Sequence, residues 1–309
     1  MDQSNERHTV SRRSVLGAAA LGGVAALAAA CAAPSIPAEP QSEAASAPGG
    51  PSATGGSASP TTSSAVAEAS PKDVIARATV PVLCYHQVRP WTSSDSSYTK
   101  TQLVIPPEKH REHLDAIKNA GYTTITPDQY HAHLTQGVEL PAKPVILSYD
   151  DGKDNQPEIA FADLTARGMK GTWFIMTVVV GNDGWTTKDQ IRQVADAGHV
   201  IGCHTWDHHD VRKYGAKDWA TQFEEPRALL QKLSGQDVDT FAYPYGAWNT
   251  AALPHLQKAG YSTAFQLEEK PIDPDRPLLT LPRALAVSTW TGDEVVAKVG
   301  AMATATPKA

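Results

Sequence analysis

Two adjacent carboxylates at the end of an apolar run are the first residues here that suggest a chemical site. Asp150 and Asp151 follow the strand-forming run 145–149, and Gly152 behind them allows the chain to turn sharply. Carboxylates are seldom buried unless they are paired or bind a metal, and two adjacent ones repel each other. The pair therefore favours a cation at one of its two side chains.

Two histidines in a similar position supply further ligands for such a cation. His204 and His208 follow a second apolar run, 200–203. One carboxylate oxygen and two imidazole nitrogens make a three-ligand site with a coordination position left for water, which is typical of catalytic zinc. The residues alone thus predict a catalytic metal centre.

These stretches resemble the motifs of the polysaccharide deacetylases, the NodB-homology or family 4 carbohydrate esterases. The family's first motif, Thr/Ser-Phe/Tyr-Asp-Asp-Gly, stands at 148–152, and its second, His-Ser/Thr-x-x-His, at 204–208. The third, Arg-x-Pro-Tyr-Gly, is partly met at 242–246. The order and rough spacing of the motifs also agree with that family.

The resemblance implies a role for each side chain. Asp151, His204 and His208 would bind the metal, and Asp150 would be the general base that takes a proton from the attacking water. The backbone N–H of Tyr245, in the third motif, would stabilise the oxyanion formed from an N-acetyl group. The products would be acetate and a free amine. Zinc is the default metal, and cobalt, nickel or iron would suit the same ligands.

The family's usual general acid is absent from this sequence. Most members carry a Leu-x-His motif near the C-terminus, whereas the corresponding region, 281–287, contains no histidine. The stretch 82–86, Val-Leu-Cys-Tyr-His, instead resembles the branch that deacetylates poly-β-1,6-N-acetylglucosamine, in which a Tyr-His at this place lies in the active site. We expect His86 to be the general acid, because the first and last strands of a barrel are neighbours. The alternative is a structural histidine at the barrel rim.

A second departure is Ala242, which stands where the third motif usually has Arg. That Arg normally orients the base aspartate in the family. Either Asp150 is held differently here, or Arg283 approaches it from the neighbouring strands, which we favour. The form Phe-Ala-Tyr-Pro-Tyr-Gly at 241–246 also occurs in the poly-N-acetylglucosamine branch, so it does not imply loss of activity.

Several other residues have two interpretations. His209 directly follows His208 and is the alternative ligand, although the family spacing favours His208. Asp154 and Asn155 either orient the aspartates or belong to a turn. Three tryptophans near the expected mouth of the barrel would stack on sugars, with at least one expected in the core: Trp185, Trp206 and Trp248. Four histidines on predicted helices are expected to be solvated: His110, His113, His131 and His133.

Strands alternate with helices from residue 72 onward. The expected strands are 81–86, 122–126, 145–150, 171–176, 199–204, 240–243, 261–266 and 279–287. The expected helices are 107–120, 127–135, 157–167, 187–197, 217–233 and 250–259, several ending at glycine: Gly121, Gly168, Gly198 and Gly260. Such alternation predicts an α/β fold with a parallel sheet, and both metal-binding stretches end strands, where barrel active sites are built. The expected fold is an incomplete or distorted (β/α) barrel, TIM-like, as in the deacetylase family.

The region before the barrel has the composition of an export signal and a tether. Residues 1–33 contain Ser11 to Leu16, which resembles a twin-arginine signal, and Leu27 to Cys31, which resembles a lipobox. Cys31 would then carry lipid and anchor the protein to the membrane; cleavage near Ala30 or an uncleaved anchor are the alternatives. Residues 34–71 are rich in Ala, Pro, Ser and Gly and predict a flexible linker to a catalytic domain at 72–309. Each alternative places the protein outside the cytoplasm.

Composition narrows the partners. The formal net charge of −6 leaves no basic stripe, which argues against nucleic acid. Removing Cys31 leaves two cysteines, Cys84 and Cys203, which we interpret as buried thiols rather than as a disulfide. The sequence predicts a metal-dependent deacetylase acting on N-acetylated glycan. A carbohydrate-binding protein that has lost turnover, or an enzyme acting on O-acetyl-xylan or peptidoglycan, is the alternative, and the oligomeric state stays open.

Overall fold

The structure is a computed structural model that describes residues 69–267 and 270–307. The predicted export signal, the lipobox and nearly all of the predicted linker lie outside the described residues. Within the described ranges, no helix combines the length and apolar character needed to span a bilayer. The helix α1, Pro71–Arg77, begins one residue before the predicted start of the catalytic domain.

A curled parallel sheet forms the centre of the domain. Its strands are β1 (Val82–Tyr85), β4 (Thr123–Thr124), β5 (Pro144–Asp151), β6 (Thr172–Ile175), β7 (Val200–Cys203), β8 (Thr240–Ala242), β9 (Thr263–Phe265) and β10 (Ala284–Leu285). They pair in the order β10-β1-β5-β6-β7-β8-β9, with β4 also on β5. A separate parallel pair joins β2 (Gln87–Val88) to β3 (Val104–Ile105).

The segment that ends in β10 brings the two edges of this sheet together. Leu281 forms a single parallel bridge with Phe265 of β9, and three residues later Ala284 pairs with Leu83 of β1. The sheet is therefore a barrel whose last wall is thin and irregular. This confirms the expected incomplete (β/α) barrel, and it makes the first and last strands neighbours.

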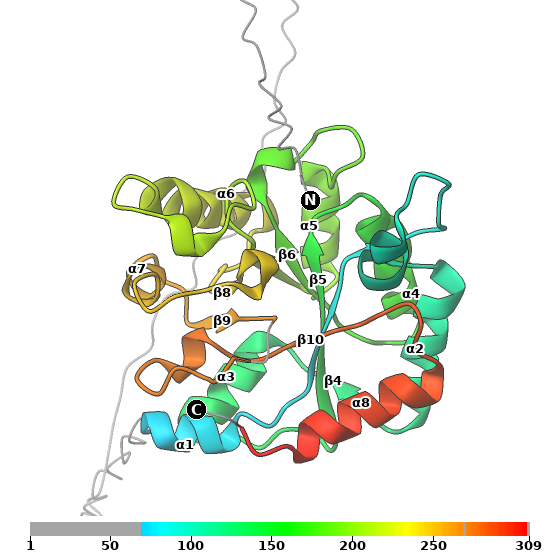
Figure 1. Cartoon of the computed structure of the whole chain (residues 1–309), viewed down its shortest axis with the longest axis horizontal. Helices are drawn as coiled ribbons and strands as arrows, with labels where there is room; N and C mark the ends of the chain where they lie inside the picture. The colour runs from blue at the N-terminus through cyan, green and yellow to red at the C-terminus, as the bar shows by residue number, and fades with distance from the viewer. Residues whose placement is uncertain (1–68, 268–269, 308–309) are drawn as a thin grey trace, which may run out of the picture. The chain divides into compact units, whose positions relative to one another are not determined.

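Helices cover the outside of the strands (Figure 1). The α-helices after α1 are α2 (Pro107–Asn119), α3 (Pro127–Gln136), α4 (Phe161–Ala166), α5 (Lys188–Asp196), α6 (Glu225–Ser234), α7 (Leu253–Lys258) and α8 (Gly292–Thr304). Shorter helical turns are η1 (Thr99–Leu103), η2 (Gln156–Ala160), η3 (Thr177–Val179), η4 (Val211–Lys213), η5 (Ala220–Glu224), η6 (Pro244–Gly246) and η7 (Pro277–Leu279). The four glycines expected to end helices all have positive φ.

The sequence patterns failed in two places. The predicted strand 279–287 is wrong over most of its length, since only 284–285 form β10 and the preceding residues make η7 and an irregular crossing. The helices α1 and α8 were not expected. Both have a capping box, Ser70 with Asp73 and Thr291 with Glu294, which is the signal that the sequence offered.

Side chains along each strand point alternately to the helices outside the barrel and to its inside, so they form two hydrophobic clusters. Leu83, Tyr85 and their equivalents on the next strands face the helices, whereas Val82, Ile146, Phe174 and Phe265 fill the inside of the barrel. Gly202 is needed on the inner face, because a Cβ there would lie 2.5 Å from the ring of Phe174. Polar side chains on the inner face near the strand ends, such as Ser148 and Asp150, therefore point into the barrel.

The outer face carries an aromatic row that two histidines join. Tyr85, Tyr149 and Trp173 are register partners on β1, β5 and β6, and their rings stack at 5.4 and 4.5 Å between centroids. The helix α2 places His110 and His113 against this row, both fully buried.

The expectation that His110 and His113 are solvated is wrong. His110 lies 2.8 Å from the Tyr149 hydroxyl and 3.0 Å from the Asp163 carboxylate, and His113 lies 2.8 Å from the Trp290 carbonyl. Each imidazole thus finds the hydrogen-bond partners that a buried polar group needs. Burial lowers the pKa of both histidines, so they favour the neutral form.

Candidate metal centre

The two aspartates at the end of β5 lie in different surroundings. Asp150 continues the inner column of Ser148 and is 2% exposed, whereas Asp151 is partly exposed. Strand alternation by itself would send the two side chains to opposite faces. Asp151 has a φ of +81°, and the left-handed turn that it shares with Gly152 brings its carboxylate round to the histidines.

The three expected ligands lie close together. The Oδ1 atom of Asp151 lies 3.6 Å from Nε2 of His204 and 3.4 Å from Nε2 of His208. Two ligand atoms on one zinc ion, each about 2.1 Å from it in tetrahedral geometry, are separated by roughly 3.4 Å. The same Asp151 oxygen is buried without a hydrogen-bond partner. The residues therefore fit a divalent metal, which would satisfy that oxygen.

The two histidines present the nitrogen that a metal needs. His204 is buried, and its Nδ1 donates a hydrogen bond of 2.7 Å to the Ala242 carbonyl, which leaves the Nε2 lone pair facing Asp151. Burial lowers the pKa of His204 to about 4, so this imidazole stays neutral. The backbone N–H of His208 donates to the Thr205 hydroxyl, and its ring packs edge-on against Tyr245.

Backbone strain is concentrated around these ligands. Among the described residues, five non-glycine positions have positive φ, and four of them belong to the site: Asp151, Thr205, His208 and Tyr245. Such conformations cost of order 1–3 kcal/mol each and persist where the surrounding structure imposes them. The loops after β5, β7 and β8 are thus held in conformations that aim their side chains at one point.

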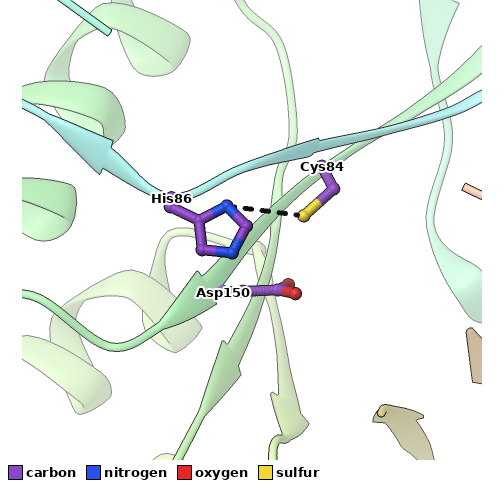
Figure 2. Close-up of side chains that lie close together, drawn as sticks. All are labelled: Cys84, His86 and Asp150. Atoms are coloured by element: carbon purple, nitrogen blue, oxygen red, sulfur yellow. Dashed lines mark hydrogen bonds between the residues drawn. The ribbon is translucent and has the colours of Figure 1, made fainter. Parts of the chain in front are cut away.

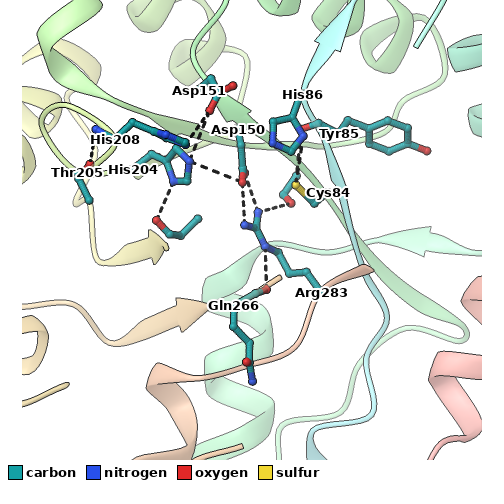
Figure 3. A network of polar contacts seen from close by, with 12 residues as sticks. Cys84, Tyr85, His86, Asp150, Asp151, His204, Thr205, His208, Gln266 and Arg283 are labelled. Carbon is teal, nitrogen blue, oxygen red and sulfur yellow. Dashed lines mark hydrogen bonds and ion pairs between the residues drawn. The ribbon is translucent and has the colours of Figure 1, made fainter. Parts of the chain in front are cut away.

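Arg283 holds Asp150 in place (Figure 3). Its guanidinium donates to both carboxylate oxygens, at 2.6 and 2.8 Å, and to the Ser148 hydroxyl at 3.1 Å. Its Nε donates to the Gln266 carbonyl at 3.3 Å. Burial by itself would raise the pKa of Asp150, but the charges of Arg283 and His204 hold it well below its ordinary value. Asp150 is therefore an ionised carboxylate with no free rotation.

His86 lies on the other side of Asp150, where β1 continues beyond its last paired residue. Its Nδ1 is 3.9 Å from the Cys84 sulfur, and both residues lie beside the Asp150 carboxylate. Gln156, which the sequence analysis did not single out, donates its amide to the carbonyls of both His86 and Asp150. Asn155 accepts from the Val88 N–H at 2.8 Å, so it ties the loop after β5 to β2.

The remaining expected residues differ in exposure. Tyr245 is 61% exposed, and Trp206 is 40% exposed. Trp185 is partly buried beneath the Lys153 ammonium group, and Trp248 packs on the core while its Nε1 donates to Gln266. His209 instead pairs with Asp207 at 2.7 Å, and the groups that converge on Asp151 are His204 and His208.

Both cysteines of the domain are free and buried, as expected: Cys84 and Cys203. A cavity of about 390 Å³ lies away from the metal centre, between α1, α3 and η7, and none of the site residues lines it.

Known proteins resemble this chain. The family model described as polysaccharide deacetylase matches residues 137–264, which include both aspartates and both histidines. The chain carries a polysaccharide deacetylase domain. A relative in Bacillus subtilis (strain 168), YxkH, named as a candidate polysaccharide deacetylase, is 26% identical over 225 residues, or 73% of this chain and 77% of the relative.

A second relative of this deacetylase domain is the poly-β-1,6-N-acetyl-D-glucosamine N-deacetylase of Staphylococcus aureus (strain MRSA252). It is 27% identical over 161 residues, which cover 48% of this chain and 56% of the relative. The chain therefore matches only about half of that enzyme's length.

Two solved structures have the same fold. IcaB from Ammonifex degensii is 27% identical with a TM-score of 0.59, over 73% of this chain and 97% of that one. The Streptococcus pyogenes deacetylase PplD, solved with acetate, has a TM-score of 0.66 at 21% identity, over 71% of this chain and 97% of that one. At that identity, the second likeness speaks for the fold alone.

Proposed function

We propose that this protein is a metal-dependent hydrolase that removes N-acetyl groups from a polymer of N-acetylglucosamine. The observation that carries the proposal is the convergence of Asp151, His204 and His208 on one point, with the ionised Asp150 beside them. A protein that only binds glycan has no evident need for a fixed, ionised carboxylate next to a metal site.

The side chains around the metal centre divide the work of hydrolysis. Asp150, held by Arg283, accepts a proton from the attacking water. The backbone N–H of Tyr245 donates to the oxygen that becomes negative when the acetyl carbonyl is attacked. His86, next to Asp150 and partly exposed, gives a proton to the leaving amine. Arg283 and Gln156 act by position, since they fix the carboxylate of Asp150 and the backbone of His86.

The ligand set favours zinc as the ion. Two neutral imidazoles and one carboxylate are ligands of catalytic zinc, although cobalt, nickel and iron also accept them. When bound, such an ion polarises the acetyl carbonyl and makes a water more acidic. The three ligands would hold it through Nε2 of His204, Nε2 of His208 and Oδ1 of Asp151.

The proposed substrate is poly-β-1,6-N-acetylglucosamine. The name of the Staphylococcus aureus relative supports it, as do the Tyr-His at 85–86 and the Ala in place of Arg at 242. The contact between Arg283 and Asp150 supports an active enzyme. Arg283, directly before β10, takes the place of the arginine that the third motif lacks.

Acetate release tests this function directly. The purified protein with one equivalent of zinc should release acetate from β-1,6-linked N-acetylglucosamine oligomers, and a chelator should stop the release. Peptidoglycan, chitin oligomers and O-acetyl-xylan belong in the same panel, and a preference for one of them would reassign the substrate. No metal-dependent acetate from any of the glycans would favour the carbohydrate-binding alternative.

Replacing Asp150 by Asn separates the base from the metal site. The rate should fall by about 10²- to 10⁴-fold, the usual contribution of a general base, while one equivalent of zinc still binds. Zinc content and acetate release are measured on the same sample. Asp151→Asn is the matched control, because it should lose the metal together with the activity.

We further propose that the chain is exported and held in the cell envelope by lipid on Cys31. The signal-like residues 1–33 and the tether-like residues 34–71 support this location. Growth with a labelled fatty acid should label the wild-type protein and should not label Cys31→Ala. Label on neither protein would rule out the lipid anchor and leave cleavage near Ala30 or an uncleaved anchor.

A further inference from the structure

A second group of ligand atoms lies next to the proposed catalytic centre (Figure 2). It consists of the Cys84 sulfur, an imidazole nitrogen of His86 and a carboxylate oxygen of Asp150, and we call these three residues the thiol cluster. Their ligand atoms all lie within 4.8 Å of one another. The thiol cluster shares no residue with the site formed by Asp151, His204 and His208.

We propose that the thiol cluster is a second metal site, selective for thiophilic divalent ions such as zinc, cadmium and cobalt, and that its occupation inhibits the enzyme. Thiolate and imidazole are ligands that such ions prefer to water or carboxylate alone.

The geometry of the strands produces this arrangement. Cys84 and His86 alternate along β1 and its continuation, so both face the inside of the barrel, and Cys84 is the register partner of Ser148, two residues before Asp150. The Cys84 sulfur and Nδ1 of His86 are 3.9 Å apart. Zinc bound to one sulfur and one nitrogen separates them by roughly 3.6 Å, so this pair needs a movement of only a few tenths of an ångström. The Asp150 oxygen lies within 4.8 Å of both ligand atoms.

One side of the thiol cluster is open to solvent, and an ion that enters can displace the thiol proton. Cys84 is fully buried, and His86 is the partly exposed member that leaves one side open to solvent. Burial raises the pKa of the Cys84 thiol well above its ordinary value and the Asp150 charge adds to this, whereas the Arg283 guanidinium opposes it, so the thiolate forms only when an ion binds. An ion that binds displaces the thiol proton, which passes to the solvent. Asp150 already receives Arg283 on both oxygens, but each oxygen retains a lone pair for a metal.

Inhibition follows from the identity of two of the ligands. The thiol cluster contains Asp150 and His86, which are the base and the acid of the proposed function, and this consequence rests on that function. An ion held between them would withdraw the lone pair of the base and the proton of the acid together.

Cobalt provides a direct readout of the site, because a thiolate bound to Co²⁺ gives a near-ultraviolet charge-transfer band. The full-length chain carrying Cys31→Ser, which leaves Cys84 and Cys203 as its thiols, is titrated with Co²⁺. The band should be absent after the first equivalent and should appear with the second, together with release of one proton. A chain that binds one equivalent, or two without the band, would overturn the proposal.

The two thiols of the domain form a matched pair of variants. Both are buried in the same sheet, but Cys203 faces the outer core, away from the thiol cluster. Cys84→Ser should lose the second equivalent and its band, whereas Cys203→Ser should retain both. Cys84→Ala repeats the test without a buried hydroxyl, and binding of the first equivalent shows that each variant is folded. A band that survives in Cys84→Ala would assign the thiolate elsewhere and refute the site.

An activity measurement distinguishes this proposal from the proposed function. Excess zinc beyond one equivalent should slow acetate release in the wild type and in Cys203→Ser, each compared with its own rate at one equivalent. Cys84→Ser should show no such slowing. If the proposed function fails, no acetate is released but the cobalt band remains. If the thiol cluster binds no ion, acetate is released at the same rate in excess zinc.

Discussion

Asp150 and Asp151 are neighbours in the chain, yet their partners divide them into two roles. Asp150 is paired on both oxygens by Arg283, whereas Asp151 has a buried oxygen without a hydrogen-bond partner that faces two imidazoles. A cation bound at Asp151 would satisfy its buried oxygen, which otherwise lacks a partner, whereas both oxygens of Asp150 already accept a hydrogen bond. The hydrogen bonds therefore support the proposed division between base and ligand, independently of any motif.

Arg283 offers the sharpest test at the scale of single residues. Arg283→Lys keeps the charge but loses the bidentate contact with Asp150, and groups that orient a metal site typically contribute about 10- to 100-fold to activity. Acetate release should fall within that range while zinc content stays at one equivalent. Arg111→Lys, which alters an ion pair with Asp163 outside the site, is the control and should keep the wild-type rate.

The reverse outcome for Arg283→Lys would also be informative. A full rate in this variant would mean that Asp150 does not depend on a fixed orientation. Arg283→Met should instead destabilise the fold by about 3–5 kcal/mol, because it leaves the buried Asp150 carboxylate without a compensating charge. Urea unfolding of the two variants separates lost orientation from lost stability.

At the scale of elements, the loops that follow the strands carry the site, and the strands set where those loops begin. β5, β7 and β8 lie in one sheet, with β6 between β5 and β7, and each ends at or is followed by at least one left-handed, non-glycine residue. Because left-handed backbone is costly for side chains with a Cβ, these positions are places where stability is given up for geometry.

Tyr245 allows this cost to be measured. Its φ is +58° and its side chain is 61% exposed, so truncation removes little packing. Tyr245→Gly should be more stable than Tyr245→Ala by about 1 kcal/mol, since glycine adopts this conformation without strain. Urea unfolding at one zinc equivalent measures the difference. Equal stability of the two variants would show that the turn after β8 stores no strain.

At the scale of the whole molecule, buried neutral histidines make the fold sensitive to acid. His199 directly precedes β7 and is almost fully buried. Its Nδ1 accepts a hydrogen bond from the Gly171 N–H. Burial, with a smaller contribution from the Lys170 charge, lowers the pKa of His199 to about 4. Below the ordinary histidine pKa, the unfolded chain therefore takes up a proton that the folded chain does not accept.

Acid should therefore destabilise the fold through His199. As pH falls from about 6.5 towards 4, His199 should lower the free energy of unfolding by about 1.4 kcal/mol per pH unit, and above that range it should have no effect. His199→Asn keeps an acceptor for Gly171 but cannot titrate, so its stability should fall less steeply with acid. Urea unfolding at several pH values compares the slopes, and identical slopes would contradict the prediction.

The local patterns of the sequence were sufficient for the parts of this protein that depend on neighbouring residues. The alternating strands and helices, the glycines at the helix ends and the positions of Asp150, Asp151, His204 and His208 at strand ends are all local in origin. They were enough to predict the barrel and the family. The capping boxes of α1 and α8 are local signals of the same kind, and they mark where these two unexpected helices begin.

Only the tertiary structure decided how distant residues meet. The contact between Arg283 and Asp150 joins positions separated by 133 residues, and the irregular segment before β10 could not be distinguished from a strand in the sequence. His110 and His113 lie on a helix whose polar residues suggested solvent, yet the aromatic row on β1, β5 and β6 buries them. Cys84 is a candidate ligand because the fold brings it next to Asp150, which lies 66 residues further along the chain. Strand register determines which side chains share the inside of the barrel, and it pairs strands that lie far apart in the chain.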